Sequence, residues 1–278
     1  MGAAQPKFTG SAEEKADAAK VRREGKDLQV ALRPRKRRQI MSANRKPELE
    51  GDWREVLIDA GGVTLEGTLA LPRNPRGLVL FAHGSGSSRH SPRNQYVAQI
   101  LRSNGVGTLL FDLLTRREES VDRYSGEFRF DIDFLAKRLV AATHWIAKDV
   151  STRDLKLGYF GASTGAGAAL VAAAEFPKVV SAIVSRGGRP DLAGSALGLV
   201  TAPTLLIVGG DDKPVITMNR EALARLKCSD KKLVIVPGAT HLFEEPGTLE
   251  AVAKLAAEWF SSHFMPAKKV HSARASSS

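Results

Sequence analysis

The pattern Gly-x-Ser-x-Gly occurs at residues 161–165 and places Ser163 two residues from a glycine on each side. An apolar run at 155–160 precedes the pattern and small residues at 166–174 follow it, which predicts a strand, a tight turn and a helix. Such a turn can make a serine a nucleophile, because the free N–H groups at the helix start favour a developing anion. The alternative is that Ser163 is only a small residue in a Gly/Ala-rich helix start.

A serine hydroxyl is a weak nucleophile near neutral pH and needs a base, which in turn needs an orienting carboxylate. The apolar run at 204–208 leads through two glycines to Asp211 and Asp212. The apolar run at 233–236 leads into a loop that carries His241, and of the six histidines only this one follows a late strand in that way. We therefore expect Ser163, one aspartate and His241 at the carboxyl ends of strands, where open α/β sheets place their sites.

Attack on a carbonyl also requires two backbone donors that hold the oxyanion. The first expected donor is the N–H of Thr164, directly after the serine. The second should come from the loop at 83–88, which follows an apolar run at 78–82, and we assign it to Ser85. We interpret His83 in the same loop as a buried structural histidine rather than a second base.

These residues need a framework of strands that alternate with helices. Two alternating stretches separated by Gly61-Gly62 predict a hairpin, and the later runs of four to six aliphatic residues suit strands buried on both faces of a parallel sheet. The sequence predicts an α/β fold with a mostly parallel central sheet of about eight strands and helices on both faces. The expected strands are 53–59, 63–71, 78–82, 107–111, 155–160, 179–184, 204–208 and 233–236, and the expected helices are 95–103, 130–148, 165–175, 217–226 and 248–261.

Four motifs together resemble the dienelactone hydrolase-like branch of the α/β-hydrolase superfamily. They are FAHGSG at 81–86, GASTG at 161–165, VGGDD at 208–212 and GATHLF at 238–243, and the resemblance covers most of residues 53–264. It implies an α/β-hydrolase fold and a catalytic triad of Ser163, Asp212 and His241, with no metal and no cofactor. The family's spacing from the glycines at 209–210 favours Asp212 over Asp211. The founding enzymes use cysteine where this chain has serine, so their lactone specificity is not carried over.

The expected function is that of a serine hydrolase acting on small carboxylic esters, thioesters or lactones. Acyl transfer by the same triad and a non-catalytic binding role on a hydrolase fold are the alternatives. A nucleotide-dependent oxidoreductase fits less well. Its glycine loop should follow the first strand rather than the fifth, and no tyrosine here begins a Tyr-x-x-x-Lys pair. About 15 residues at 186–201 leave little room for a large lid.

Three arginines could contact substrate. Arg89 follows the loop at 83–88, Arg116 lies in a long charged loop expected at 113–129, and Arg186 follows the apolar run at 179–184. An arginine that faces the pocket would favour an anionic acyl group, whereas the simpler interpretation is a solvated surface. The sequence does not decide between contact with substrate and a solvated surface for these arginines.

The net charge of +11 belongs to the two ends of the chain. Residues 1–46 hold 13 basic and 5 acidic residues and 266–278 hold three basic residues, which leaves 25 of each sign in the 47–265 domain. We expect both ends to be disordered. The basic run from Arg33 to Arg38 could bind nucleic acid or an acidic partner, or could be a solvated extension before a native start at Met41.

The remaining composition excludes some classes of protein. No apolar run approaches the ~20 residues that span a bilayer, so an integral membrane protein is not expected. The single cysteine, Cys228, rules out an internal disulfide framework and a cysteine-based metal site, and it suits a reducing compartment such as the cytoplasm.

Overall fold

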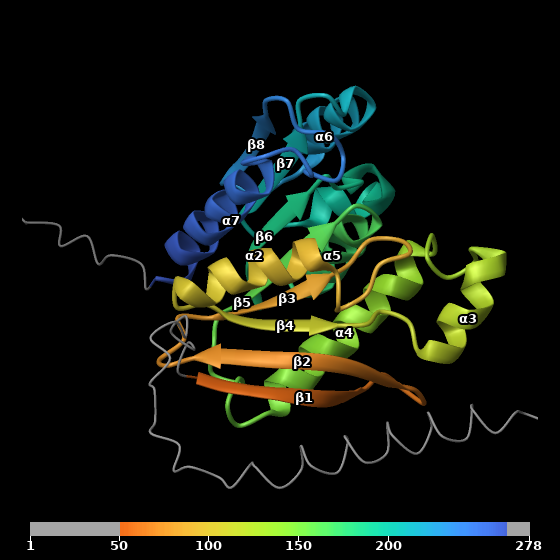
Figure 1. The fold of residues 1–278 in the computed structure, drawn as a ribbon, viewed down its shortest axis with the longest axis vertical. Coiled ribbons are helices and arrows are strands. Elements are labelled where there is room, and N and C mark those ends of the chain that lie inside the picture. Colours follow the sequence, from red (N-terminus) through yellow and green to blue (C-terminus); the bar gives the residue numbers. More distant parts are fainter. Residues whose placement is uncertain (1–50, 266–278) are drawn as a thin grey trace, which may run out of the picture. The chain divides into compact units, whose positions relative to one another are not determined.

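The computed structural model describes residues 51–265. The expectations for 1–46 and 266–278, including the basic run from Arg33 to Arg38, lie outside the described residues. Within the described part, one sheet of eight strands has the order β1-β2-β4-β3-β5-β6-β7-β8 (Figure 1). The strands are β1 (Gly51–Asp59), β2 (Thr64–Pro72), β3 (Leu78–Ala82), β4 (Gly107–Phe111), β5 (Leu157–Ala162), β6 (Val180–Arg186), β7 (Thr204–Gly209) and β8 (Lys231–Val236).

The predicted mostly parallel sheet with an antiparallel start is confirmed. β1 and β2 form an antiparallel hairpin, β2 pairs antiparallel with β4, and every pair from β4 through β8 is parallel. The four strands β3, β4, β5 and β7 are buried along their whole length. This explains why they read as continuous apolar runs rather than as alternating patterns.

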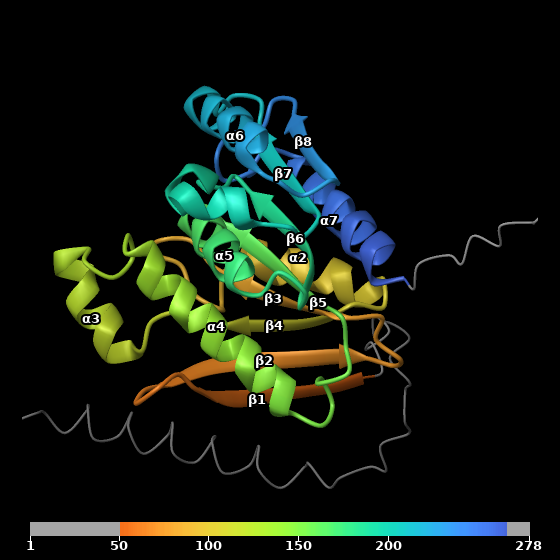
Figure 2. The ribbon, with the colours of Figure 1, turned by 180° about the vertical axis from the view of Figure 1, so that it is seen from behind.

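Helices cover both faces of the sheet, as expected. On one face α2 (Pro92–Ser103) and α7 (Thr248–Phe264) share an apolar core with the sheet. On the other face α4 (Ile132–Lys148), α5 (Thr164–Glu175) and α6 (Lys213–Arg225) form a second core with it, as Figures 1 and 2 show from the two sides.

Two segments differ from the sequence expectation. The charged loop expected at 113–129 contains a helix, α3 (Arg116–Ser125), and a 3-10 helical segment, η1 (Pro190–Leu199), connects β6 to β7. Thr115 and Glu118 begin α3 with a capping box, in which each side chain accepts a hydrogen bond from the other residue's backbone N–H. α3 stands to one side of the sheet, beyond the end of β4 (Figure 2).

Candidate active site

Ser163 lies in the sharp turn between β5 and α5. Its backbone has φ 50° and ψ −122°, a conformation that L-residues rarely adopt. The glycines on either side permit this turn. A Cβ on Gly161 would lie 2.4 Å from Ala166 Cα, and a Cβ on Gly165 would lie 2.2 Å from the Ala82 carbonyl oxygen. The turn therefore presents the serine side chain at the carboxyl edge of the sheet.

Asp212, His241 and Ser163 form a continuous chain of polar contacts. His241 Nδ1 lies 2.7 Å from Asp212 Oδ2, and His241 Nε2 lies 3.3 Å from Ser163 Oγ. A carboxylate only accepts, so the Nδ1–H group donates a hydrogen bond to Asp212. Nε2 then carries no hydrogen and is the acceptor that faces the serine. A Cβ on Gly209 would lie 2.3 Å from the Ala239 carbonyl oxygen, and this close approach brings the two loops together. Among the described residues it is Asp212, rather than Asp211, that contacts the imidazole.

The two expected oxyanion donors lie side by side, but one of them is occupied. Thr164 is the first residue of α5, where a backbone N–H has no acceptor within the helix. The Ser85 N–H donates to Thr164 Oγ1 at 3.0 Å. Oxyanion donors act at ~2.7–3.1 Å from the charged oxygen, so the Thr164 hydroxyl occupies the place where Ser85 would hold that oxygen.

The Ser85 hydroxyl extends this contact toward α3. Ser85 Oγ lies 2.9 Å from Thr164 Oγ1 and donates to the Arg129 carbonyl oxygen at 3.2 Å. Because that carbonyl only accepts, the hydroxyl of Thr164 donates to Ser85 Oγ. The Arg129 N–H donates in turn to Asp122 Oδ1 on α3 at 3.0 Å. The loop at 83–88, called the oxyanion loop from here on after its expected role, is thus connected to α3 by hydrogen bonds.

Asp122 holds the segment that follows α3 against the helix. Its carboxylate accepts from the backbone N–H groups of Phe128 and Arg129 and from Arg129 Nε. Burial by itself would raise the pKa of this carboxyl, but these hydrogen bonds outweigh it and the pKa is lowered.

His83 has a structural position, as expected. Its Nε2 accepts from the Leu113 N–H at 3.0 Å, and its Nδ1 lies 3.0 Å from the Gly84 carbonyl oxygen and donates to it. A ring that accepts at Nε2 and donates at Nδ1 is neutral, and burial lowers the pKa of His83 in the same sense. The histidine therefore ties the oxyanion loop to the end of β4.

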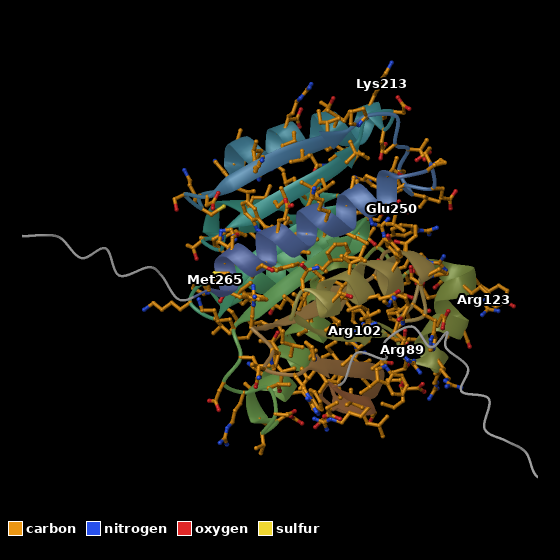
Figure 3. All side chains as sticks on the ribbon, turned by 60° about the vertical axis from the view of Figure 1, so that its left-hand side comes forward. Arg89, Arg102, Arg123, Lys213, Glu250 and Met265 are labelled. Atoms are coloured by element: carbon orange, nitrogen blue, oxygen red, sulfur yellow. The ribbon has the colours of Figure 1, made fainter. Side chains whose placement is uncertain are left out.

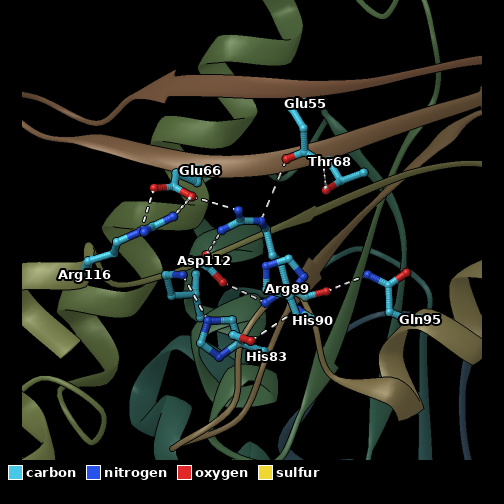
Figure 4. A network of polar contacts seen from close by, with 11 residues as sticks. Glu55, Glu66, Thr68, His83, Arg89, His90, Gln95, Asp112 and Arg116 are labelled. Carbon is cyan, nitrogen blue, oxygen red and sulfur yellow. Dashed lines mark hydrogen bonds and ion pairs between the residues drawn. The ribbon is translucent and has the colours of Figure 1, made fainter. Parts of the chain in front are cut away.

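Arg89 and Arg116 belong to an ion-pair network built around Glu66 and Asp112 (Figure 4). Arg89 pairs with Asp112 and donates to Glu66 at 2.8 Å, and Arg116 binds the same Glu66 with two contacts of 3.0 Å. Hydrogen bonds from Arg116 and then Arg89 lower the pKa of Glu66. Both guanidinium groups are therefore engaged by carboxylates of the protein itself.

Arg186 is buried at the end of β6. Its Nη2 donates to Asn94 Oδ1 of α2 at 3.2 Å, and the guanidinium carbon lies 6.0 Å from the centre of the Phe243 ring. Burial, followed by the charge of nearby Arg93, lowers the pKa of Arg186 to about 10. Its side chain therefore packs against α2 and Phe243.

A cavity of about 300 Å³ lies next to the site. Ser163 and His241 are not among its lining residues, but Ser85 and Gly84 are, and a Cβ on Gly84 would lie 3.0 Å from Ser163 Cβ. The oxyanion loop therefore borders both the cavity and the serine. Its lining is His83, Gly84, Ser85, Gly86, Ser87, Ser88, Asp112, Leu113, Leu114, Glu119, Asp122, Arg123, Arg129 and Leu135.

Sequence reasoning missed the α3 side of this cavity because it expected a loop there. The available signal was the Thr115–Glu118 capping box. Within residues 51–265, no group of three or more His, Cys, Asp or Glu side chains could hold a metal ion, and no helix is long and apolar enough to cross a membrane.

The chain matches several known proteins. The family model of the dienelactone hydrolase family matches residues 65–265. A dienelactone hydrolase structure from Anabaena variabilis is 60% identical, covers 77% of this chain and 98% of that chain, and has a TM-score of 0.75. Est1E from Butyrivibrio proteoclasticus, at 18% identity with coverage of 75% and 98% and a TM-score of 0.63, shares the fold.

Two Mycobacterium tuberculosis proteins, provisionally named phosphoribosyl transferase, are 60% identical over 212 residues, which is 75% of this chain and 46% of theirs. The chain therefore spans about half the length of these relatives.

Proposed function

The chain belongs to the dienelactone hydrolase family, whose solved relatives are hydrolases and esterases, and from this premise we propose that it is a serine hydrolase of small carboxylic esters. The observation that carries the proposal is the chain of contacts from Asp212 through His241 to Ser163. A hydroxyl, an imidazole and a carboxylate in this order are what nucleophilic acyl transfer requires.

In the first half of the reaction, Ser163 Oγ attacks the ester carbonyl carbon while His241 Nε2 takes its proton. The carbonyl π pair moves onto oxygen, and Asp212 stabilises the imidazolium that forms. When the tetrahedral intermediate collapses, the bond to the alkoxy oxygen breaks and His241 gives its proton to that oxygen. The alcohol leaves, and the acyl group remains on Ser163.

In the second half, water attacks the acyl-enzyme. His241 removes a proton from the water, and the same Nε2 returns it to Ser163 Oγ as the carboxylic acid departs. The Thr164 N–H stabilises the oxyanion in both halves, and the Ser85 N–H joins it once the Thr164 hydroxyl turns away. An alcohol in place of water would make the same site an acyltransferase.

The name of the mycobacterial relatives is not carried over. The match covers 46% of their length, so their named activity can reside in the part that this chain does not match. The family match and the dienelactone hydrolase structure both fall on the matched part of this chain, and they support hydrolysis.

The test is hydrolysis of p-nitrophenyl acetate by the wild type, Ser163→Ala and Ser103→Ala, the last an exposed serine of α2 outside the cavity lining. Ser163→Ala should lose at least about a thousandfold in kcat with no loss of thermal stability, whereas the matched variant Ser103→Ala should keep its activity. A fluorophosphonate probe should label the wild type at Ser163 and leave Ser163→Ala unlabelled. Near-full turnover by Ser163→Ala would refute the mechanism.

A further inference from the structure

The cavity beneath α3 lies on one particular side of Ser163. β5, which leads to the serine, has β3 and β4 on one side and β6, β7 and β8 on the other. The loops after β3 and β4 line the cavity, whereas Asp212 and His241 follow β7 and β8. The histidine and the cavity therefore flank the serine from opposite sides.

This arrangement orients an ester. The alkoxy oxygen must lie beside His241 Nε2, because that atom protonates it as it leaves. The acyl group is on the other side of the carbonyl carbon and so points toward β3 and β4. There Ser85 and Gly84, which contact Thr164 and Ser163, form the wall of the cavity.

Two acidic residues of the cavity lining are paired with arginines of the protein itself. Asp112 is paired with Arg89, and the buried Asp122 is paired with Arg129. The three arginines considered as substrate contacts, Arg89, Arg116 and Arg186, are absent from the lining of this cavity in the described structure. A charged acyl group would have to leave water without a partner here, which is costly.

Two charges remain at the rim. Glu119 and Arg123 are one turn apart on α3, both are exposed, and neither has an ion-pair partner among residues 51–265. Figure 3 shows Arg123 on α3, away from the sheet. Because the two charges are opposite and adjacent, they offset each other and the rim favours neither an anion nor a cation.

We propose that this cavity is the acyl subsite and that it selects an uncharged acyl group. The inference rests on the proposed ester hydrolysis. A cavity of about 300 Å³ has room for roughly ten groups of the volume that one water molecule takes in the liquid. Leu113, Leu114 and Leu135 give it an apolar side, and Ser87 and Ser88 add hydroxyl groups. A neutral acyl chain of medium length, plain or hydroxylated, fits this lining.

The test compares p-nitrophenyl esters of acetate, hexanoate and adipate, the last with a free terminal carboxylate. Each methylene buried in the cavity should raise kcat/KM about fourfold, so hexanoate should exceed acetate, and adipate should fall well below hexanoate. Leu114→Trp should remove the hexanoate advantage and keep acetate turnover, because acetate does not reach the cavity. Leu114→Phe adds less bulk and should reduce the hexanoate advantage in part.

The opposite charges of Glu119 and Arg123 are tested with a separate variant. Glu119→Gln leaves the Arg123 charge without its neighbour and should raise kcat/KM for the adipate ester severalfold, with hexanoate unchanged. Glu127→Gln, which alters an exposed glutamate outside the cavity lining, is the matched control.

The outcomes are distinct. An unchanged hexanoate-to-acetate ratio in Leu114→Trp and Leu114→Phe, with acetate turnover intact, would overturn the acyl subsite. A wild-type preference for the adipate ester would overturn the selection for uncharged groups. Absence of turnover for every ester by folded wild type would instead overturn the proposed hydrolase, and the subsite with it.

Discussion

Replacing Thr164 by valine tests whether its hydroxyl competes with the substrate for the oxyanion hole. Valine keeps the shape of the side chain and removes the oxygen that accepts the Ser85 N–H at 3.0 Å. In the wild type this hydrogen bond must break before Ser85 can hold the oxyanion. In Thr164→Val, water takes its place at the partly exposed loop and leaves when the substrate enters.

The size of the effect follows from the bond that is removed. A neutral hydrogen bond contributes about 0.5–1.5 kcal/mol net, and about 1.4 kcal/mol corresponds to a tenfold change in rate. We therefore expect Thr164→Val to raise kcat/KM by about two- to tenfold. Thr164→Ser keeps the hydroxyl and should stay close to the wild type.

The assay is the initial rate of p-nitrophenyl acetate hydrolysis over a range of concentrations, with kcat and KM determined separately for the three proteins. Thermal melting of each protein checks that the site remains folded. A tenfold loss in Thr164→Val with activity retained in Thr164→Ser would refute the reasoning, because the hydroxyl would then donate to the oxyanion rather than compete with it.

Three further predictions concern the framework of the site. Asp212→Asn should lower kcat by about three to four orders of magnitude and leave folding intact, since an amide does not stabilise the His241 imidazolium. The loss in kcat is measured across a pH-rate profile of the variant and the wild type. Gly165→Ala should destabilise the fold by at least about 1–3 kcal/mol, whereas Gly198→Ala, whose Cβ would meet nothing within 4 Å, should melt like the wild type. Because the folded pKa of Asp122 is lowered, its stabilisation is complete above the ordinary carboxyl pKa and is lost as the pH falls through the lowered value. The melting temperature of Asp122→Asn should therefore lie below that of the wild type at pH 7, and the gap should narrow in acid.

The buried strands could be predicted from the sequence because burial on both faces leaves an unbroken apolar run. β3 and β4 occupy the predicted residues, and β7 extends one residue beyond its prediction. β5 begins and ends two residues later than predicted, because its last two residues are the Gly and Ala of the turn into Ser163 and do not look like a strand. Local composition therefore predicts a strand well where the whole strand is buried on both faces.

α3 could not be recognised from periodicity. It contains only Val121 and Tyr124 as large apolar residues, and both are exposed. Its tertiary contacts come instead from polar groups such as the buried Asp122 and the Glu118 carboxylate, which pairs with Arg138 of α4. A helix held mainly by polar contacts lacks the apolar stripe that identifies most helices.

The partners of the arginines and of the oxyanion loop depend on the tertiary fold. Arg89 and its partner Asp112 are 23 residues apart, and Ser85 and Thr164 are 79 apart. These pairs become neighbours only because β3 inserts between β4 and β5 in the sheet. Sequence reasoning could place each residue at the correct edge of the sheet without showing which groups were already occupied.

The backbone of Ser163 has a consequence for how this protein could change over time. A non-glycine residue in that conformation costs about 1–3 kcal/mol, and glycine would relieve most of it. Selection for thermal stability alone would therefore favour glycine at this position, and the hydroxyl would be lost. Only selection for the hydroxyl would keep serine there. The strained turn therefore sets the stability of the fold against the reactivity of residue 163.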